Sequence, residues 1–384
     1  MAPRLNAIIL AAGLSSRMGE LKAALPLGQG TVLEQCVGLF RECGIDNPVV
    51  VTGHRAGEIE AIAQRAGASI ARNPDFAAGM YSSIRTGVRH LDDGISAFFL
   101  LPVDIPLVRP GSIRLLARSF ADAPAAITYP VFAGRRGHPP LIGRGLIPAI
   151  LGPAHPKGGL RTLLARLEEG QPGQVAEVTV ADANIHCDLD SPEDYRKGRD
   201  RFSRRDFPTM DECTVILRHL HPMPEKGLAH GRLVAEIAVA LCMALPGHGC
   251  GGLDAELCRV GGWLHDIAKG AADHERQGGR WLRELGFGRA AEIVAAHRDL
   301  SWQKGDALTE KELVSFADKL ARGNRMIGID ERFQEKLALY KDMPDAVQAI
   351  RKRYDQALLI KAAVEDAAGQ GLDTILAPLM PCSL

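Results

Sequence analysis

A loop of small residues near the start of the chain combines residue types that bind phosphate. Residues 6–10 form an apolar run that predicts a buried parallel strand, and Gly13 and Gly19 after it let backbone N–H groups approach phosphate oxygens closely. Arg17 and Lys22 would neutralise the charge of those phosphates. An ordinary turn has the same glycine and serine content. The loop still predicts a nucleoside triphosphate site, and because it lacks both the Walker spacing and G-x-G-x-x-G, a kinase or dehydrogenase is disfavoured.

Two carboxylates could hold a magnesium ion beside this loop. Residues 97–101 predict a second central strand, which places Asp104 just past its carboxyl end, where open α/β sheets keep their ligand crevice. A hard cation that bridges phosphate oxygens needs one or two carboxylates, and we expect Asp190 to be the second. The structural alternatives are a turn aspartate before Pro106 and a helix N-terminal residue before Ser191.

These groups suit the transfer of a nucleotidyl group. An acceptor phosphate attacks the α-phosphorus in line while pyrophosphate leaves, so charge neutralisation and positioning carry the rate. Arg17, Lys22 and Asp104 with Mg²⁺ fit those catalytic roles. Ser82 and Ser83 precede a predicted helix, whose N–H groups and hydroxyls could hold base, ribose or acceptor phosphate, although a helix cap explains the serines equally well.

Several short motifs follow one another in the order of a known family. They are LAAG at 10–13 with LSS and RMG after it, NPDF at 73–76, GMYSSIRTG at 79–87, LPVDIP at 101–106, GHPP at 137–140 and DLDSPED at 188–194. This set resembles the molybdenum cofactor nucleotidyltransferases, which have a Rossmann-like fold, and it covers roughly the first half of the chain. The resemblance implies a nucleotide-binding set of Leu10, Ala11, Ala12, Gly13, Arg17, Lys22, Gly79, Ser82, Ser83 and Asp104.

The form of the loop bears on which nucleotide is used. LAAG, rather than LAGG, is similar to the cytidylyltransferase branch of the family, so the resemblance implies CTP and a molybdopterin-type cofactor carrying molybdenum as substrates. A molybdenum hydroxylase apoenzyme is an implied partner, because relatives with the same loop serve as accessory proteins of those enzymes. Two alternatives remain: a sugar-phosphate or other nucleotidyltransferase, because those enzymes share the general fold, and an accessory protein of a molybdenum hydroxylase.

The second half contains a histidine and aspartate pattern typical of metal ligands. His265 and Asp266 are adjacent in the apolar helical context of WLHDIAK at 263–269, and the other candidates are His230, His274, His297 and Asp318. Imidazoles bind borderline transition metals and carboxylates bind harder ones, so a doublet on one helix can present both to a shared ion. A lone histidine is usually structural, but independent histidines rarely fall into this full order with both HDIAK and ADKL contexts.

This pattern resembles the HD metal-dependent phosphohydrolase superfamily. The resemblance makes His230 the first metal ligand, His265 and Asp266 the doublet, and Asp318 the last ligand. It also matches His274 and His297 with the extra histidines of members that bind two metals. A bound metal can lower the pKa of water and so supply hydroxide. The resemblance implies that Asp266 and Lys269 are catalytic, and Lys269 would neutralise a phosphate. The metal could be Fe, Mn, Zn, Ni or Co. A module that binds metal or nucleotide without turnover is the alternative.

Composition bounds the class and location of the protein. Its 384 residues exceed the range of a single hydrophobic core. Equal numbers of basic and acidic residues, 46 each, give zero formal net charge and argue against a nucleic-acid partner. Eight cysteines without a C-x-x-C pair indicate reduced thiols. We expect no signal peptide ahead of the first strand and no apolar run long enough to span a bilayer, hence a cytoplasmic protein without a membrane partner.

Periodicity predicts an α/β domain followed by an all-α domain. Apolar runs of strand length at 7–10, 49–52, 97–101, 126–130 and 175–180 alternate with helical patterns at 32–43, 58–66 and 112–120, which implies crossover helices and a mostly parallel sheet. Beyond residue 208 only helical periodicity follows, at 211–220, 229–245, 253–268, 274–285, 289–297, 309–321 and 330–365. We expect a nucleotidyltransferase domain at 1–200, a charged linker at 201–210 and an HD-type helical domain at 211–384.

Overall fold

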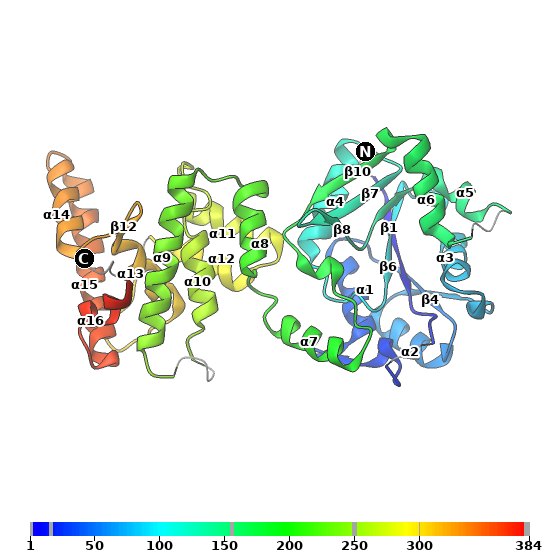
Figure 1. The fold of residues 1–384 in the computed structure, drawn as a ribbon, viewed down its shortest axis with the longest axis horizontal. Helices are drawn as coiled ribbons and strands as arrows, with labels where there is room; N and C mark the ends of the chain where they lie inside the picture. Colours follow the sequence, from blue (N-terminus) through cyan, green and yellow to red (C-terminus); the bar gives the residue numbers. More distant parts are fainter. Residues whose placement is uncertain (1–2, 15–17, 154–156, 248–251, 299, 380–384) are drawn as a thin grey trace. The chain divides into compact units, whose positions relative to one another are not determined.

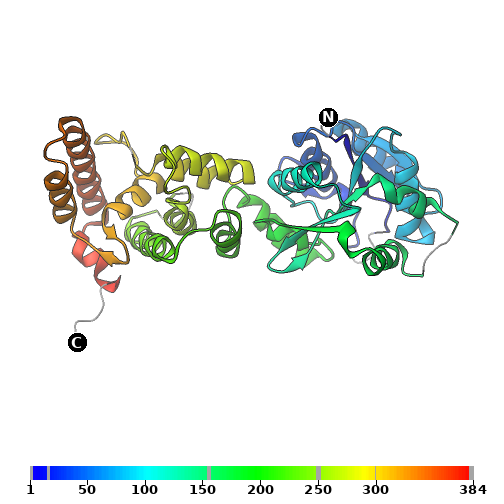
Figure 2. The ribbon, with the colours of Figure 1, turned by 90° about the horizontal axis from the view of Figure 1, so that it is seen from above.

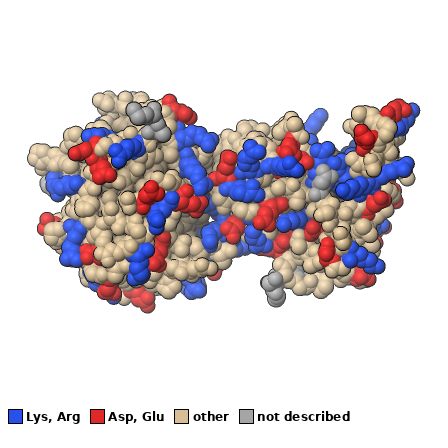
Figure 3. All heavy atoms as spheres, turned by 180° about the vertical axis from the view of Figure 1, so that it is seen from behind, with Lys and Arg blue, Asp and Glu red and all other residues tan. Residues whose placement is uncertain are grey.

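The computed structural model describes residues 3–14, 18–153, 157–247, 252–298 and 300–379. The chain divides into two compact units, Met1–Arg205 and Asp206–Leu384. Figure 1 shows that the first unit is built of helices around a sheet and that the second is helical. The expected fold class, a Rossmann-like α/β domain followed by a helical domain, is confirmed. On the face shown in Figure 3, basic and acidic side chains are interspersed over both units.

A mixed, mostly parallel sheet forms the centre of the first unit. The strands of this unit are β1 (Leu5–Leu10), β2 (Pro26–Leu27), β3 (Gly30–Thr31), β4 (Val49–Thr52), β5 (Ser69–Arg72), β6 (Ala97–Pro102), β7 (Ile127–Phe132), β8 (Arg135–Arg136), β9 (Leu141–Gly143) and β10 (Val175–Thr179). The sheet has the order β10-β7-β9-β6-β1-β4-β5, with β8 paired to β7 and a separate β2–β3 hairpin. β1 lies between β4 and β6 and is parallel to both, which brings three carboxyl ends to one edge. β9 is antiparallel to β6 and β7.

Helices cover both faces of this sheet (Figure 2). They are α1 (Val32–Glu42), α2 (Ala56–Ala66), α3 (Met80–Arg89), α4 (Pro110–Asp122), α5 (Ile147–Leu151), α6 (Gly159–Gly170) and α7 (Pro192–Ser203), with short 3-10 turns η1 (Lys22–Ala24), η2 (Phe76–Ala78), η3 (Arg144–Leu146), η4 (Pro172–Gln174) and η5 (Ala183–His186). α3 and α6 pack on one face, where Ile84 meets Ile8, whereas Phe40 of α1 meets Phe99 on the other. Gly87 allows the close approach of α3, because a Cβ there would lie 2.6 Å from Ile8 Cγ2.

The second unit is a bundle of helices with one small hairpin. Its elements are α8 (Met210–Val215), a π-helical turn (Ile216–Leu220), α9 (Glu225–Ala244), α10 (Ala255–Leu264), α11 (His274–Leu285), α12 (Gly288–Ala296), α13 (Glu310–Lys319), β11 (Ala321–Arg322), β12 (Arg325–Met326), α14 (Ile329–Leu339), α15 (Pro344–Ala368), α16 (Leu372–Leu376) and the 3-10 turn η7 (Ala377–Leu379). Glycines permit the tight packing of α9 on α10, since a Cβ at Gly262 would lie 2.5 Å from the backbone of Ala235.

Three expectations about the helical unit are wrong in detail. The segment at 330–365 is two helices rather than one, because α14 ends at Leu339 and Pro344 begins α15. The hairpin of β11 and β12 interrupts the helical pattern after α13. The His265–Asp266 doublet does not lie within a helix, because α10 ends at Leu264 and a hydrogen-bonded turn from Leu264 O to Ile267 N follows.

The expectation that no apolar run reaches membrane-spanning length is also wrong. α9 has 20 residues with a mean hydropathy of 1.4 in its most apolar part, which suffices by length and composition. Half of that part is buried, however, and α9 packs against α10 and α13. Because it also carries the buried His230, α9 has the properties of a core helix of this unit.

Candidate active sites

A cavity of about 460 Å³ opens at the carboxyl ends of β1 and β6. It brings together most of the residues expected to bind nucleotide or magnesium, namely Leu10, Ala11, Ala12, Gly13, Lys22, Gly79, Ser83, Asp104 and Asp190. The loop main chain is held by the sheet, because Ala11 N donates to Val51 O at 2.9 Å and Val103 N donates to Leu10 O at 3.1 Å. Arg17 lies outside the described residues.

Lys22 lies between the two candidate carboxylates. Its Nζ donates to Asp190 Oδ1 at 2.6 Å and to Asp104 Oδ2 at 3.3 Å. The main chain aligns these acids, because Leu189 N donates to Asp104 O at 2.8 Å and so joins the segment before α7 to the end of β6. Only 11% of the Lys22 side chain is exposed, compared with 28% of Asp104 and 44% of Asp190. A cation and two carboxylates therefore meet at the wall of the cavity.

Sequence reasoning did not single out Asp188 as a site residue. Burial, together with the negative charges of Asp104 and Asp190, raises the pKa of Asp188 above its ordinary value. The signal was available in the motif DLDSPED, where Asp188 precedes Asp190 by two residues. Asp188 thus interacts with both candidate carboxylates, although it is not among the described residues that line the cavity.

The two serines at the start of α3 have different surroundings. Ser82 Oγ donates to the carbonyls of Asp75 and Gly79 and accepts from Asn73 Nδ2 at 2.8 Å, and Ser82 is not among the described residues that line the cavity. Ser83 lines the cavity and accepts from Asn73 Nδ2 at 3.0 Å. The buried Asn73 therefore anchors the start of α3, and Ser83 lines the cavity.

A buried ion pair supports the segment that leads to Asp190. Arg109 Nη1 lies 2.8 Å from Asp182 Oδ1, and the same carboxylate accepts from the backbone N of Arg109 and of Asn184 and from Ser112 Oγ. Only 1% of Asp182 is exposed. Because a buried carboxylate needs such partners, this network fixes α4 against η5, from which the chain continues to Asp188 and Asp190.

The predicted ligands of the helical unit converge on two groups that share one carboxylate. His230, His265 and Asp266 form the first group, and Asp266, His274 and His297 form the second, with all ligand atoms of each group within 4.8 Å of one another. Asp318 extends the first group, since its Oδ1 lies 3.3 Å from His230 Nε2 and 3.7 Å from His265 Nε2. Asp266 thus lies where it could bridge two metal ions.

The histidine rings are oriented from behind by protein oxygens. The Nδ1 atoms of His230, His265 and His297 lie 2.7–3.1 Å from the carbonyls of Gly323, Gly262 and Val294. Nδ1 of His274 lies 3.1 Å from Glu275 Oε2 but makes no hydrogen bond to it. An Nδ1 proton on that side leaves the Nε2 lone pair free for a metal. Among the described residues, the buried Nε2 of His265 has no hydrogen-bond partner. This donor set therefore fits metal ions.

Electrostatics favour the metal-binding protonation states of two of these groups. Burial opposes ionisation of Asp266, but its contacts with His265 and Lys269 outweigh that penalty and hold the pKa of its carboxyl well below the usual range. Burial and the nearby His265 lower the pKa of His297 to about 3, so the ring is neutral at pH 7. Lys269 Nζ lies 2.5 Å from Asp266 Oδ2, so its ammonium contacts a predicted ligand directly.

A large pocket of about 1120 Å³ opens onto His230 and Asp266. Its basic lining residues come from several elements and are Lys226, Lys269, Arg322, Arg332 and Lys336. Met223, Ile267 and Leu339 supply apolar lining. α14 contributes Arg332, whose Nη2 lies 3.5 Å from Asp318 Oδ1. The pocket therefore combines a metal-binding end with a mainly basic and partly apolar lining, in which Glu335 is paired with Arg322.

Comparisons with known proteins identify a family for each of the two units. The family model for the MobA-like NTP transferase domain matches residues 7–171, and the model for the HD domain matches residues 227–323. The molybdenum cofactor cytidylyltransferase of Escherichia coli is 28% identical over 201 residues, covering 52% of this chain and 97% of that protein. The nicotine blue oxidoreductase of Paenarthrobacter nicotinovorans is 30% identical over 206 residues, covering 50% and 94%. The phosphoenolpyruvate guanylyltransferase of Rubrobacter xylanophilus is 31% identical over 192 residues, covering 48% and 87%. The chain therefore belongs to the MobA-like NTP transferase family through its α/β unit and carries an HD domain in its helical unit.

Proposed function

We propose that the α/β unit transfers a cytidylyl group from CTP to molybdenum-bound molybdopterin, with Mg²⁺, and releases pyrophosphate. The observation that carries this proposal is the meeting of Lys22 with Asp104 and Asp190 at the wall of the cavity. The similarity to the Escherichia coli cytidylyltransferase over nearly its full length supports the choice of nucleotide and acceptor.

The residues of the cavity would bind and orient both reactants. A phosphate oxygen of the acceptor forms a new bond to the α-phosphorus, while the bond from that phosphorus to the pyrophosphate oxygen breaks in line. Backbone N–H groups around Ala12 and Gly13 would hold the triphosphate, and Lys22 supplies a fixed positive charge. The carboxylates of Asp104 and Asp190 both contact the ammonium group of Lys22, so their oxygens lie close enough together to fit Mg²⁺. When bound, Mg²⁺ would neutralise phosphate charge.

Pyrophosphate release tests this assignment. Purified full-length protein is incubated with Mg²⁺, the molybdenum cofactor and either CTP or GTP, since one relative is a guanylyltransferase. We expect cofactor-dependent release with CTP that exceeds release with GTP. The variant Asp104→Asn should be slower by about 100-fold or more, whereas Asp122→Asn, at an exposed acid ending α4, should match the parent. Release with GTP and none with CTP would contradict the cytidylyl assignment.

We further propose that the HD domain hydrolyses a phosphate ester at a two-metal centre. The observation that carries this proposal is the membership of Asp266 in both ligand groups beside a basic pocket. When bound, the metal ions would supply Lewis acidity at phosphorus and activate a water. Lys226, Arg332 and Lys336 would hold the phosphate, while apolar lining residues such as Met223 and Leu339 would contact the organic group of the ester. The water oxygen would bond to phosphorus as the ester P–O bond breaks, and one proton of that water would end on the leaving oxygen, which gives an alcohol and a phosphate.

Phosphate release from a panel of nucleotides and cyclic nucleotides tests hydrolysis. We expect metal-loaded protein to hydrolyse at least one member of the panel and Asp266→Ala to abolish that activity. Asp273→Ala is the matched control, because Asp273 is exposed and lies outside both ligand groups. A metal-loaded parent that binds these nucleotides but hydrolyses none would instead establish a binding module. An Asp266→Ala variant with full activity would reject the catalytic role of the doublet.

A further inference from the structure

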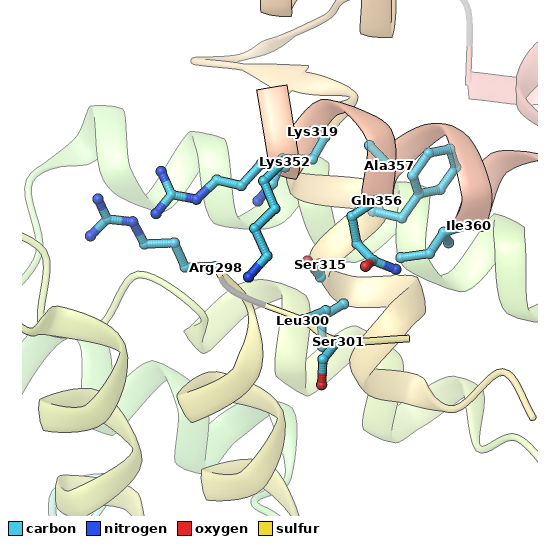
Figure 4. A pocket seen from close by; sticks show the side chains of 11 residues that line it. Arg298, Leu300, Ser301, Ser315, Lys319, Lys352, Gln356, Ala357 and Ile360 are labelled. Carbon is cyan, nitrogen blue, oxygen red and sulfur yellow. The ribbon is translucent and has the colours of Figure 1, made fainter. Parts of the chain in front are cut away.

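A second, smaller pocket of about 180 Å³ lies between α13 and α15 of the helical unit. Four basic residues from three segments line it: Arg298 after α12, Lys319 on α13, and Lys352 and Arg353 on α15. Figure 4 shows Lys352 extending from α15 toward Ser315 and Leu300 on the opposite wall. This pocket is distinct from the larger one, because the two share no lining residue.

The charge of this pocket is strongly one-sided. Among its described lining residues there is no aspartate or glutamate, whereas the polar side chains of Ser301, Ser315 and Gln356 add hydrogen-bonding groups. Lys319 is buried, with 8% exposure. Lys319 is paired with Asp318, and Arg298 Nη1 lies 3.7 Å from Glu275 Oε1, but neither of these acids lines the pocket, so the charged groups that border its space are basic. The lining thus favours a compact anion.

The pocket lies next to the two groups of predicted metal-binding residues, but none of those residues lines it. Lys319 Nζ lies 2.8 Å from Asp318 Oδ2 and donates to His297 O at 3.4 Å, and Ser315 Oγ donates to the same carbonyl at 2.7 Å. Gln356 is held in place by a hydrogen bond from its Nε2 to Trp302 O at 2.8 Å. The α15 wall begins at Lys352, beyond residue 323 where the match to the HD domain ends. This site is therefore built jointly by the HD domain and the helices that follow it.

We propose that this pocket binds a phosphate group separately from the substrate pocket. Guanidinium forks and ammonium groups are the side chains that bind phosphate oxygens best, and Arg298, Lys352 and Arg353 bring such groups to the lining from two separate segments. The volume admits a phosphate or diphosphate group but is smaller than the pockets that enclose drug-sized molecules. The group could be free inorganic phosphate or the phosphate of a nucleotide. The proposal does not depend on hydrolysis by the HD domain.

Protection of Lys352 from acetylation tests this site directly. Full-length, metal-loaded protein is treated with an acetylating reagent at increasing inorganic phosphate, with potassium chloride to hold ionic strength constant, and each lysine is quantified by mass spectrometry. We expect saturable protection of Lys352 and none of Lys361, a partly exposed lysine on the same helix outside the pocket. Because the readout is at one residue, phosphate bound elsewhere does not interfere.

Variants and a second probe complete the test. Arg353→Gln should raise the phosphate concentration for half-protection by about tenfold, the value of one charge-assisted hydrogen bond. Arg351→Gln, an exposed neighbour that does not line the pocket, should leave it unchanged. CMP in place of phosphate distinguishes the two sources, since protection by CMP at lower concentration would identify a nucleotide phosphate. Absent protection at saturating phosphate and CMP, or equal protection of Lys361, would overturn the proposal.

Discussion

The shared position of Asp266 predicts how metal content responds to loss of a single histidine. His274 belongs only to the second ligand group, whereas the first group keeps His230, His265 and Asp266, with Asp318 beside them. His274→Ala should therefore leave one metal ion tightly bound and release the other. The second group would keep two of its three ligands. Loss of a partner that merely orients a ligand weakens metal affinity 10–100-fold, so loss of a ligand should weaken it by about 100-fold or more, or at least about 2.7 kcal/mol.

The assay is metal content by elemental mass spectrometry after reconstitution with Mn²⁺ and gel filtration. In protein that also carries Asp104→Asn, so that the proposed cation site of the α/β unit adds no ion, we expect two equivalents without a further change, one with His274→Ala and fewer than one with Asp266→Ala. His219→Ala is the matched control, because His219 is exposed and belongs to neither group. Two equivalents retained in His274→Ala would refute the assignment of the second group. Loss of both ions would refute the independence of the first.

Three further predictions concern the architecture that supports the sites. Asp182→Ala should lower the free energy of unfolding of the α/β unit, measured in urea, by about 3–5 kcal/mol, because Arg109 would remain buried without its carboxylate. Glu58→Ala, which breaks the exposed pair with Arg55, is the comparison. An equally small change for both variants would contradict the buried network. Gly262→Ala should lower the stability of the helical unit by about 1–3 kcal/mol, because the added methyl group would push α9 away from α10. Gly288→Ala should not, because its methyl group would meet open space. Equal melting temperatures of the two variants would show that the helices adjust without cost. Lys22→Met should slow pyrophosphate release by about 100-fold or more through loss of positive charge, and an unchanged rate would remove Lys22 from the site.

Features that depend on local apolar runs could be predicted from the sequence. The runs at 7–10 and 97–101 correspond to β1 and β6, and adjacent strands in a parallel sheet end at one edge, so the proximity of Leu10 and Asp104 followed from sheet geometry. The strands β5 and β9 were not predicted. β9 has only three residues, which is too short for a periodic signal, and it acquires its place from pairing with β6 and β7.

Long-range contacts between polar residues could not be predicted in the same way. Arg109 and Asp182 are separated by 73 positions, and neither has a local pattern that marks it as buried. The basic pocket between α13 and α15 depends on where α15 packs, which helical periodicity leaves open. In contrast, the six candidate ligands of the HD domain were found because their residue types and order carried the signal, whereas their grouping around Asp266 required the fold.

The hydrogen bond from Leu189 N to Asp104 O has a practical consequence for dissecting this protein. The match to the transferase family ends at residue 171, yet the chain must run on through β10 and η5 before it brings Asp190 to the cavity and Asp188 near it. An expression fragment cut at that family boundary would keep the glycine loop and Asp104 but lack Asp188 and Asp190. Such a fragment would test whether Lys22 and Asp104 suffice to bind nucleotide without Asp190, which the chain reaches just before α7.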